Sequence, residues 1–283
     1  MAPPRSILFA TDLSCRCDRA LDRTVALAGE WRARVIALHV LERPSQVIDA
    51  PSWRRADDPR RVAERRMRAD LGVGSGVELE LIVERGDAAA LVLDAAQRHD
   101  CELIVTGVAR DETLGRVLLG RTVENVVRRA TVPVLVVKSR PREPYRNIIV
   151  ATDFSETSRA GLATTLAMFP TSQVTLFHAY DVPHERYVED RMAAREGYAR
   201  AARLEAEAFL AGVPSLARER TRIVCEYGTP EALLRDLADG GMVDLVVAGT
   251  RGRGRIAELF LGSVAQSLLR GVPGDVMIVP RGA

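Results

Sequence analysis

The sequence predicts an α/β protein with two domains, each a five-stranded parallel sheet flanked by helices. Short apolar runs alternate with longer amphipathic segments, which is the pattern of parallel strands joined by crossover helices. The pattern occurs twice in the 283 residues, and short blocks of the first half return in the second half in the same order. These two observations predict one doubly wound domain and its repeat.

The repeat consists of paired blocks that share length, order and apolar character. Ser6–Ser14 returns as Asn147–Ser155, Val35–Val40 as Val174–Ala179, Val83–Asp87 as Cys225–Thr229, Leu103–Gly107 as Leu245–Gly249, and Val134–Val137 as Val276–Val279. We therefore expect one domain over residues 1–140 and a second over residues 146–283. The segment between Ser139 and Arg146 contains proline and arginine, as is typical of a linker.

Each domain is expected to alternate strands with helices. In the first copy, the apolar periodicity predicts strands at 6–10, 34–40, 77–84, 102–106 and 133–138, and helices at 16–30, 59–71, 88–98 and 120–130. Asp87 precedes the third of these helices and is expected to cap it, because its side chain can accept a hydrogen bond from a free N–H.

The second copy repeats this order from residue 146 with some differences. The segment 183–211 predicts a longer charged helix that forms a solvated outer layer. Thr229 followed by Pro230 is typical of a helix start, with threonine as the cap and proline in the first turn. Cys101 and Cys225 lie beside or within predicted strands, so we expect both to be buried.

Charge and composition argue against several classes of function. A net charge of +2 disfavours bulk nucleic-acid binding, and no apolar run reaches the length of a membrane span. The apolar run near the amino terminus is too short for a signal peptide, so we expect a cytoplasmic protein. Lys138 is the sole lysine and follows a strand, which excludes a Walker-type phosphate loop. The four cysteines lack the spacing of a zinc or redox motif.

A glycine-bearing loop at residues 249–263 joins the apolar run at 245–248 to a helix-like segment. The carboxyl ends of strands are where ligands bind in open α/β sheets. Free N–H groups at a helix start attract an anion, glycines allow its close approach, and Arg251, Arg253 and Arg255 add positive charge. The loop therefore predicts a phosphate cradle. The alternative is a surface loop whose glycines only make turns.

Asp12 and Asp153 follow the first strand of each copy, and a serine comes two residues after each of them. A carboxylate there can accept hydrogen bonds from a ribose hydroxyl or an adenine amino group. The alternative is a helix cap without a ligand. His39 and His178 end the second strands and are interpreted as packed, hydrogen-bonded residues rather than bases.

The sequence contains no convincing catalytic or metal-binding set. No nucleophile stands beside a base, and no pair of carboxylates has a spacing suited to acid–base chemistry. His178, Asp181 and His184 have a spacing that fits no common closed metal site, so a polar loop is the preferred interpretation.

The two copies differ where a phosphate would bind. The second copy has glycines at 249, 252 and 262 followed by Ser263, whereas the first has Arg110 in place of one glycine and Arg121 in place of the hydroxyl residue. A side chain at position 110 crowds the approach that glycine permits. An arginine can still attract phosphate, so weak binding remains open for the first copy.

The spacing Gly249-x2-Gly252-x9-Gly262-Ser263 resembles the nucleotide-binding motif of the universal stress protein family, and Asp153 resembles its first-strand aspartate. The resemblance covers both copies. It implies two Rossmann-like domains that bind ATP, ADP or AMP, with or without Mg²⁺. Carried over, the residues that contact the nucleotide are Thr152, Asp153, Ala179, Gly249, Thr250, Arg251, Gly252, Arg253, Gly262, Ser263 and Val264.

The resemblance implies a stress-response protein that binds an adenine nucleotide mainly in its second domain and acts as a sensor or adaptor for an unknown protein partner. The first copy, with Asp12 and Val40 kept but Arg110 and Arg121 changed, is expected to be a degenerate site. The alternatives are a slow ATPase and an interaction scaffold that needs no nucleotide. The family also implies pairing through the last strands, which predicts a dimer-like single chain that can associate into a homodimer.

Overall fold

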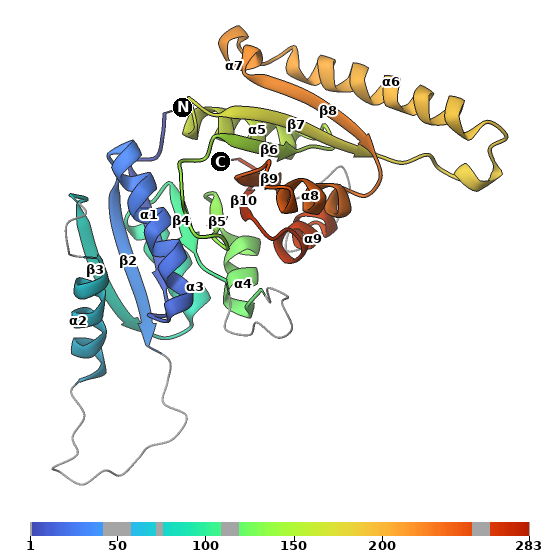
Figure 1. The fold of residues 1–283 in the computed structure, drawn as a ribbon. Helices are drawn as coiled ribbons and strands as arrows, with labels where there is room; N and C mark the ends of the chain where they lie inside the picture. Colours follow the sequence, from blue (N-terminus) through green and yellow to red (C-terminus); the bar gives the residue numbers. More distant parts are fainter. Residues whose placement is uncertain (1, 42–57, 72–75, 109–118, 251–260, 283) are drawn as a thin grey trace. The chain divides into compact units, whose positions relative to one another are not determined.

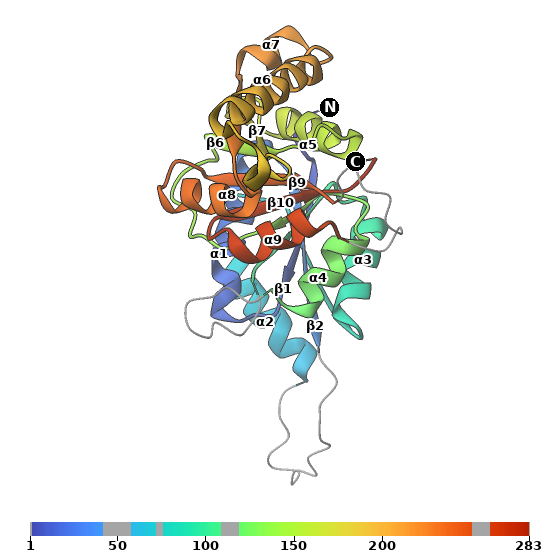
Figure 2. The ribbon, with the colours of Figure 1, turned by 90° about the vertical axis from the view of Figure 1, so that its right-hand side faces the viewer.

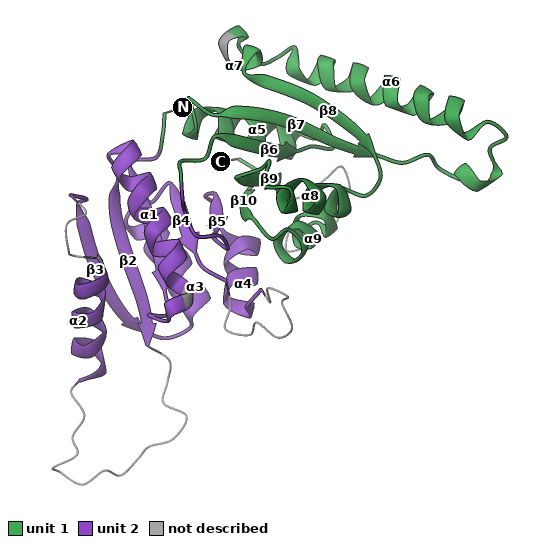
Figure 3. Cartoon of the chain, in the orientation of Figure 1, with its two compact units in different colours: residues 1–3, 115–117, 143–283 green, residues 4–114, 118–142 purple. Residues whose placement is uncertain are grey.

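The computed structural model describes residues 2–41, 58–71, 76–108, 119–250 and 261–282. The described residues from Pro4 to Arg142 form one compact unit, and those from Glu143 onward form a second (Figure 3). Each unit contains one of the two sequence repeats. Within the described residues, no helix has the length and apolar character needed to cross a bilayer.

The first unit alternates strands and helices as the periodicity predicts (Figure 1). Its elements are β1 (Ser6–Thr11), α1 (Asp18–Trp31), β2 (Arg34–Leu41), α2 (Pro59–Leu71), β3 (Leu79–Arg85), α3 (Ala88–Arg98), β4 (Leu103–Thr106), α4 (Arg121–Arg129) and β5 (Val134–Val136). The strands are parallel in the order β3-β2-β1-β4-β5. The side chain of Asp87 accepts a hydrogen bond from the N–H of Ala90 at 2.8 Å, so the predicted cap of α3 is confirmed.

The second unit repeats this topology. Its elements are β6 (Asn147–Ala151), α5 (Glu156–Met168), β7 (Gln173–Tyr180), α6 (Arg191–Leu210), α7 (Ser215–Glu219), β8 (Thr221–Tyr227), α8 (Pro230–Asp239), β9 (Leu245–Gly249), α9 (Ser263–Gly271) and β10 (Asp275–Val279). Its strands are parallel in the order β10-β9-β6-β7-β8. The α/β prediction, with five described strands in each unit, is confirmed.

Helices cover both faces of each sheet because successive right-handed crossovers run in opposite directions from the middle strand. In the second unit, α5 lies beside α6, with the guanidinium of Arg159 4.2 Å from the ring centre of Phe209, while α8 lies beside α9 (Figure 2). The central strands β6 and β9 are consequently buried on both faces, and Val150 and Val247 are fully inaccessible. The apolar runs in the sequence reflect this double burial.

Three details differ from the sequence-based expectations. The segment 183–211 is not one helix, because a 3-10 turn at Glu185–Tyr187 precedes α6, whose cap Asp190 accepts a hydrogen bond from Ala193 N–H at 2.9 Å. Helix α8 begins at Thr229 and Pro230 as expected, with threonine at the cap position and proline in the first turn, but the threonine side chain makes no capping hydrogen bond. Cys225 is half-buried rather than buried, since β8 is the last strand of its sheet.

Candidate functional site

The middle of the second sheet contains a topological switch point between β6 and β9. The chain passes from β6 to β7 on one side, whereas β9 leads to β10 on the other side. Val150 lies opposite Val247 in the ladder, so the same register brings Thr152 level with Gly249. Such a crevice at the carboxyl ends of parallel strands is where ligands bind in open α/β sheets.

The loop after β6 is held in a sharp turn that places Asp153 at this edge. Thr152 is buried, and its hydroxyl donates to Ser158 Oγ at 2.9 Å and accepts from Phe154 N–H at 2.9 Å. The Asp153 carboxylate accepts from Ser155 N–H at 3.1 Å. Phe154 has a φ of +61°, which is uncommon for a bulky residue and typical of a functional turn.

The hydrogen bonds of this loop show which of its polar side chains caps α5. Ser155, not Asp153, caps α5, because its Oγ accepts from Ser158 N–H at 3.2 Å. Asp153 belongs to the turn, is half-buried and follows the carboxyl end of β6. Ser155 is therefore the side-chain cap of α5, and Asp153 closes the turn that precedes the helix.

His178 supports the turn from the neighbouring strand. Its Nδ1 lies 2.8 Å from the carbonyl oxygen of Thr152, and its ring packs against Phe154 with the ring centres 4.4 Å apart. The expectation of a packed, hydrogen-bonded histidine is confirmed. The imidazole therefore orients the turn that carries Asp153.

Ala179 follows on β7 and exposes its backbone toward the switch point. The carbonyl oxygen of Phe177 accepts a hydrogen bond from Thr152 N–H at 2.9 Å, at the end of the register between β6 and β7. Alternate residues of a strand direct their N–H and C=O groups to the same side. The backbone groups of Ala179 therefore point toward β6 but beyond the last residue that pairs there. This arrangement suits recognition of the polar edge of a flat ring.

Gly249 ends β9 where no larger residue fits. A Cβ built there lies 2.7 Å from Thr157 Cγ2 and 3.2 Å from the carbonyl carbon and oxygen of Thr157 in α5. The glycine therefore serves the close packing of α5 on β9. Sequence analysis assigned it to ligand approach and could not identify this contact.

The chain leaves the sheet at Thr250 and returns at Gly262, and these two residues are hydrogen-bonded. Gly262 N–H donates to Thr250 C=O at 2.8 Å, and Thr250 N–H donates to Val279 C=O at 3.0 Å. The two ends of the glycine-bearing loop are thus held together beside β10. Arg251, Gly252 and Arg253 lie outside the described residues.

The first turn of α9 presents free backbone donors next to this closure. Gly262 is the N-cap and supplies no side-chain hydrogen bond, and the first turn contains no acidic residue. The first N–H groups of a helix have no intrahelical acceptor, and the helix dipole makes this end electropositive. Ser263 and Val264 are exposed there. The end of α9 therefore has the features of an anion-binding site.

The structure brings most of the predicted site residues to one edge of the second sheet. Those described are Thr152 and Asp153 after β6, Ala179 on β7, Gly249 and Thr250 after β9, and Gly262, Ser263 and Val264 at the start of α9. A carboxylate, the backbone groups of Ala179 and an electropositive helix end thus lie around the same switch point.

The first unit has the same turn at the same place. The hydroxyl of Thr11 accepts from Leu13 N–H at 3.0 Å, and Asp12 accepts from Ser14 N–H at 2.9 Å. Leu13 also has a positive φ, of +58°. His39 Nδ1 lies 2.9 Å from the carbonyl oxygen of Thr11. The two copies therefore share the backbone that places the first-strand aspartate.

Two residues that sequence analysis did not single out distinguish the first copy. The thiol of Cys17 donates to Asp12 Oδ1 at 3.2 Å, so it engages the carboxylate, whereas Ser158 occupies the equivalent position in the second copy and bonds Thr152. Glu124 lies in the first turn of α4 and opposes an anion there. Aligning the two repeats residue by residue reveals both differences. Arg110 lies outside the described residues.

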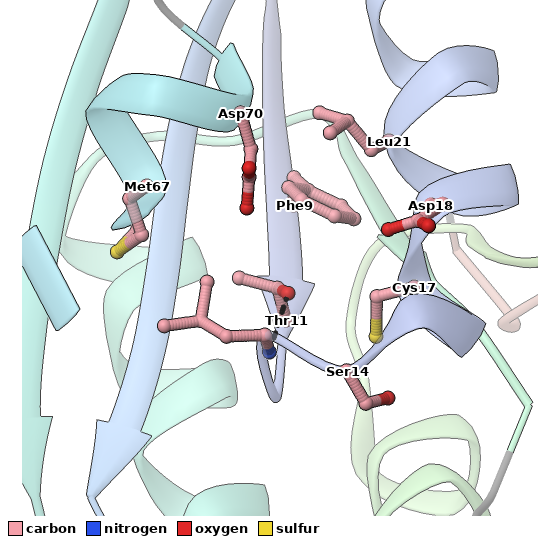
Figure 4. A pocket seen from close by; sticks show the side chains of 9 residues that line it. Phe9, Thr11, Ser14, Cys17, Asp18, Leu21, Met67 and Asp70 are labelled. Carbon is pink, nitrogen blue, oxygen red and sulfur yellow. Dashed lines mark hydrogen bonds between the residues drawn. The ribbon is translucent and has the colours of Figure 1, made fainter. Parts of the chain in front are cut away.

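A cavity of about 20 Å³ lies beside this turn in the first unit (Figure 4). Its lining includes Phe9, Ser14, Cys17 and Met67. Such a volume accommodates about one water molecule and no nucleotide. Burial raises the pKa of the Cys17 thiol to about 11, so this thiol stays protonated at neutral pH.

The carboxyl ends of β7 and β8 are bordered by a charged cluster. Glu185 accepts hydrogen bonds from Arg195 and from the hydroxyl of Tyr227, the latter at 2.6 Å. The bond from Arg195, followed by that from Tyr227, lowers the pKa of Glu185. The guanidinium of Arg195 also stacks 4.0 Å from the ring centre of Tyr227. The cluster secures the segment between β7 and α6.

The described side chains of His178, Asp181 and His184 do not form a metal-binding cluster. These three residues belong to the described part of the chain. In that part, no three side chains of histidine, cysteine, aspartate or glutamate are placed to hold a metal ion. His178 instead bonds the carbonyl of Thr152 through one ring nitrogen.

The sequence model of the universal stress protein family matches this chain twice, over residues 4–138 and 144–280. The chain belongs to the universal stress protein family. Its two matches make it a tandem member, with one family domain for each repeat.

Single-domain universal stress proteins match one half of this chain. A universal stress protein from Thermus aquaticus is 33% identical over 141 residues, which cover 48% of this chain and 98% of that protein. A universal stress protein from Synechocystis is 30% identical over 151 residues, which cover 48% of this chain and 97% of that protein.

Two solved structures match almost the whole length of this universal stress protein. A protein of unknown function from Pseudomonas aeruginosa PAO1 is 19% identical with a TM-score of 0.71, covering 98% of this chain and 92% of that one. A universal stress protein from Archaeoglobus fulgidus is 19% identical with a TM-score of 0.66, covering 98% of this chain and 99% of that one. Both likenesses show the fold.

Proposed function

We propose that this universal stress protein binds an adenine nucleotide at the switch point of its second unit. The observation that carries the proposal is the convergence of Asp153, the free backbone of Ala179 and the uncapped start of α9 on one edge of the sheet. These groups match a ribose, an adenine edge and a phosphate in that order. The ligand is ATP, ADP or AMP, with or without Mg²⁺.

Each group has a distinct role in the proposed complex. The carboxylate of Asp153 accepts hydrogen bonds from the ribose hydroxyls. The N–H and C=O of Ala179 pair with the adenine edge. The N–H groups of Ser263 and Val264, with the Ser263 hydroxyl, donate to phosphate oxygens at the electropositive end of α9. We assign Thr250, Arg251, Gly252 and Arg253 to the loop that covers the phosphates.

The first unit serves in this proposal as a degenerate copy with a structural or regulatory role. Its aspartate is engaged by Cys17, and Glu124 places a negative charge in the helix turn where a phosphate would lie. The protein then acts as a stress sensor or adaptor that passes the nucleotide state to a protein partner. The last strands, β5 and β10, pair within the chain in this proposal.

Calorimetric titration of the full chain with ATP tests the proposal. We expect one site per chain. Ser263→Ala should weaken binding by about tenfold, since a hydrogen bond contributes roughly 0.5–1.5 kcal/mol and more when the acceptor is charged. Ser267→Ala, on the same helix but one turn further from its start, is the matched control and should bind like the wild type.

The outcomes separate the proposal from its alternatives. Absence of heat with ATP, ADP and AMP would support a scaffold without nucleotide. Two equivalent sites per chain would show that the first unit is not degenerate. Turnover at roughly 1 per second or faster with Mg²⁺ would identify an enzyme rather than a binding protein.

A further inference from the structure

The second unit contains a basic groove on the outer edge of its sheet, away from the switch point. It lies between α6, α7 and the first residues of β8, and its volume is about 580 Å³. It is lined by Arg203, Glu207, Leu210, Arg218, Thr221, Arg222 and Ile223. Pockets that hold ligands measure roughly 300–1,000 Å³, so the groove has room for several residues of a peptide.

The groove runs along an open strand edge. β8 is the last strand of its sheet and pairs only with β7 among the described strands. Val174 N–H donates to Arg220 C=O, and Gly228 N–H donates to Tyr180 C=O, so the even-numbered residues between 220 and 228 direct their backbone groups to β7. Odd-numbered residues, including Thr221 and Ile223, therefore direct theirs outward. This edge can accept another strand.

Positive charge surrounds these outward backbone groups. The lining includes three guanidinium groups and one carboxylate, that of Glu207. Arg203 lies 3.5 Å from Glu207, but both side chains are mostly exposed, which makes this a weak pair. Arg222 is exposed and makes no hydrogen bond or ion pair with other described residues. The groove is therefore complementary to a negatively charged occupant.

The fold itself does not require this charge. Val35 and Val174 are equivalent in the two repeats, and they lie opposite Leu79 and Thr221. The next residue is Glu80 in the first unit and Arg222 in the second. Equivalent positions of the two copies thus have opposite charge, and only the second copy is basic there.

We propose that the groove binds an acidic segment of a partner protein, which adds as a strand to the outer edge of β8. Backbone hydrogen bonds with Thr221 and Ile223 would hold the segment, and its carboxylates would lie near Arg203, Arg218 and Arg222. A second copy of this chain fits less well, because two basic edges would face each other. The site is at the amino end of β8, whereas the nucleotide site is at the carboxyl ends of the strands.

Fluorescence anisotropy with a labelled peptide of alternating glutamate and valine tests the proposal on the full chain. We expect binding that weakens as salt increases. The double variant Arg203→Gln, Arg222→Gln should weaken it by about tenfold, while Arg66→Gln, an exposed arginine of α2 in the other unit, should leave it unchanged. ATP binding should be the same in all three proteins, which separates this test from that of the proposed function.

Two further peptides identify the mode of binding. A peptide with lysine in place of glutamate should not bind, and a peptide with proline at alternate positions should bind at least tenfold more weakly, because proline cannot donate to a ladder. The proposal is overturned if no binding occurs, if Arg66→Gln weakens it equally, or if the proline peptide binds as well. It is also overturned if pyrophosphate displaces the peptide at equal concentration, or if sedimentation shows wild-type dimers that Ile223→Pro dissociates.

Discussion

Replacing Gly249 by alanine tests whether packing, rather than ligand approach, requires a glycine at the end of β9. The added Cβ would lie 2.7 Å from Thr157 Cγ2, well inside the roughly 3.5–4.0 Å at which carbon atoms attract each other. The φ of Gly249 is not positive, so the backbone conformation accepts alanine, and only the close contact disfavours it. Thr157 is buried in the first turn of α5 and has little room to move. Overpacking of this kind costs about 1–3 kcal/mol of unfolding free energy.

A second substitution isolates this contact. Thr157→Ser removes Cγ2, after which the nearest atoms to the new Cβ are the backbone carbon and oxygen of Thr157 at 3.2 Å. The single serine variant should lose about 1 kcal/mol, the value of one buried methyl group. In the double variant with Gly249→Ala, we expect a total cost smaller than the sum of the single costs by about 1 kcal/mol.

Gly161→Ala provides the control within the same helix as Thr157. Apart from its chain neighbours and the backbone of α5 itself, nothing lies within 4 Å of a Cβ built at Gly161, so alanine there should stabilise the helix by about 0.5–1 kcal/mol. Urea unfolding followed by circular dichroism measures all the variants. The two tryptophans, Trp31 and Trp53, belong to the first repeat, so tryptophan emission follows that repeat separately.

The reasoning would be refuted by a Gly249→Ala protein as stable as the wild type. It would also be refuted if Gly249→Ala lowered the unfolding free energy by the same amount with serine at position 157 as with threonine, because the contact with Cγ2 would then play no part.

Two further predictions concern a pair of helix caps and a pair of thiols. Ser155→Ala should lower the unfolding free energy by about 1 kcal/mol, whereas Thr229→Ala should change it by only a few tenths of a kcal/mol. The reason is that only the serine caps its helix through its side chain. Equal urea midpoints for the two variants would contradict this. Alkylation at pH 8 should label the exposed Cys15 before the buried Cys17. Burial raises the pKa of Cys17 from the ordinary thiol value of 9.0 to about 11, so the fraction of Cys17 present as thiolate is roughly 100-fold smaller than for an ordinary thiol. The labelling rate of Cys17 should keep rising with pH up to about 11, and mass spectrometry that found equal rates at pH 8 would disprove its burial.

The sequence alone determined the fold class and the repeat. Apolar runs indicate strands that are buried on both faces, and amphipathic segments indicate helices with one buried side. Both patterns are local properties of the chain. Asp87 was recognised as a cap, and His39 and His178 as packed residues, for the same reason. Each of these roles depends on neighbours close in sequence or on the strand in which the residue lies.

Predictions from local patterns were wrong for details that depend on where a residue or strand lies in the sheet. Nothing in the charge pattern of 183–211 marks the turn before α6, and the sequence cannot tell that Thr229 leaves its helix uncapped. Cys225 was expected to be buried because its strand is apolar, yet the strand order places β8 at the edge. The strand order follows from the crossovers, which single-strand patterns do not encode.

Only the tertiary structure decided what surrounds the candidate site. The contact between Gly249 and Thr157, the direction of the Ala179 backbone and the bond from Cys17 to Asp12 depend on the register of paired strands or on how helices pack against them. These contacts form between side chains and backbone groups that the chain brings together only on folding. Composition and periodicity describe each segment by itself, so they predicted which elements form, while the packing of those elements set the chemistry of the edge they share.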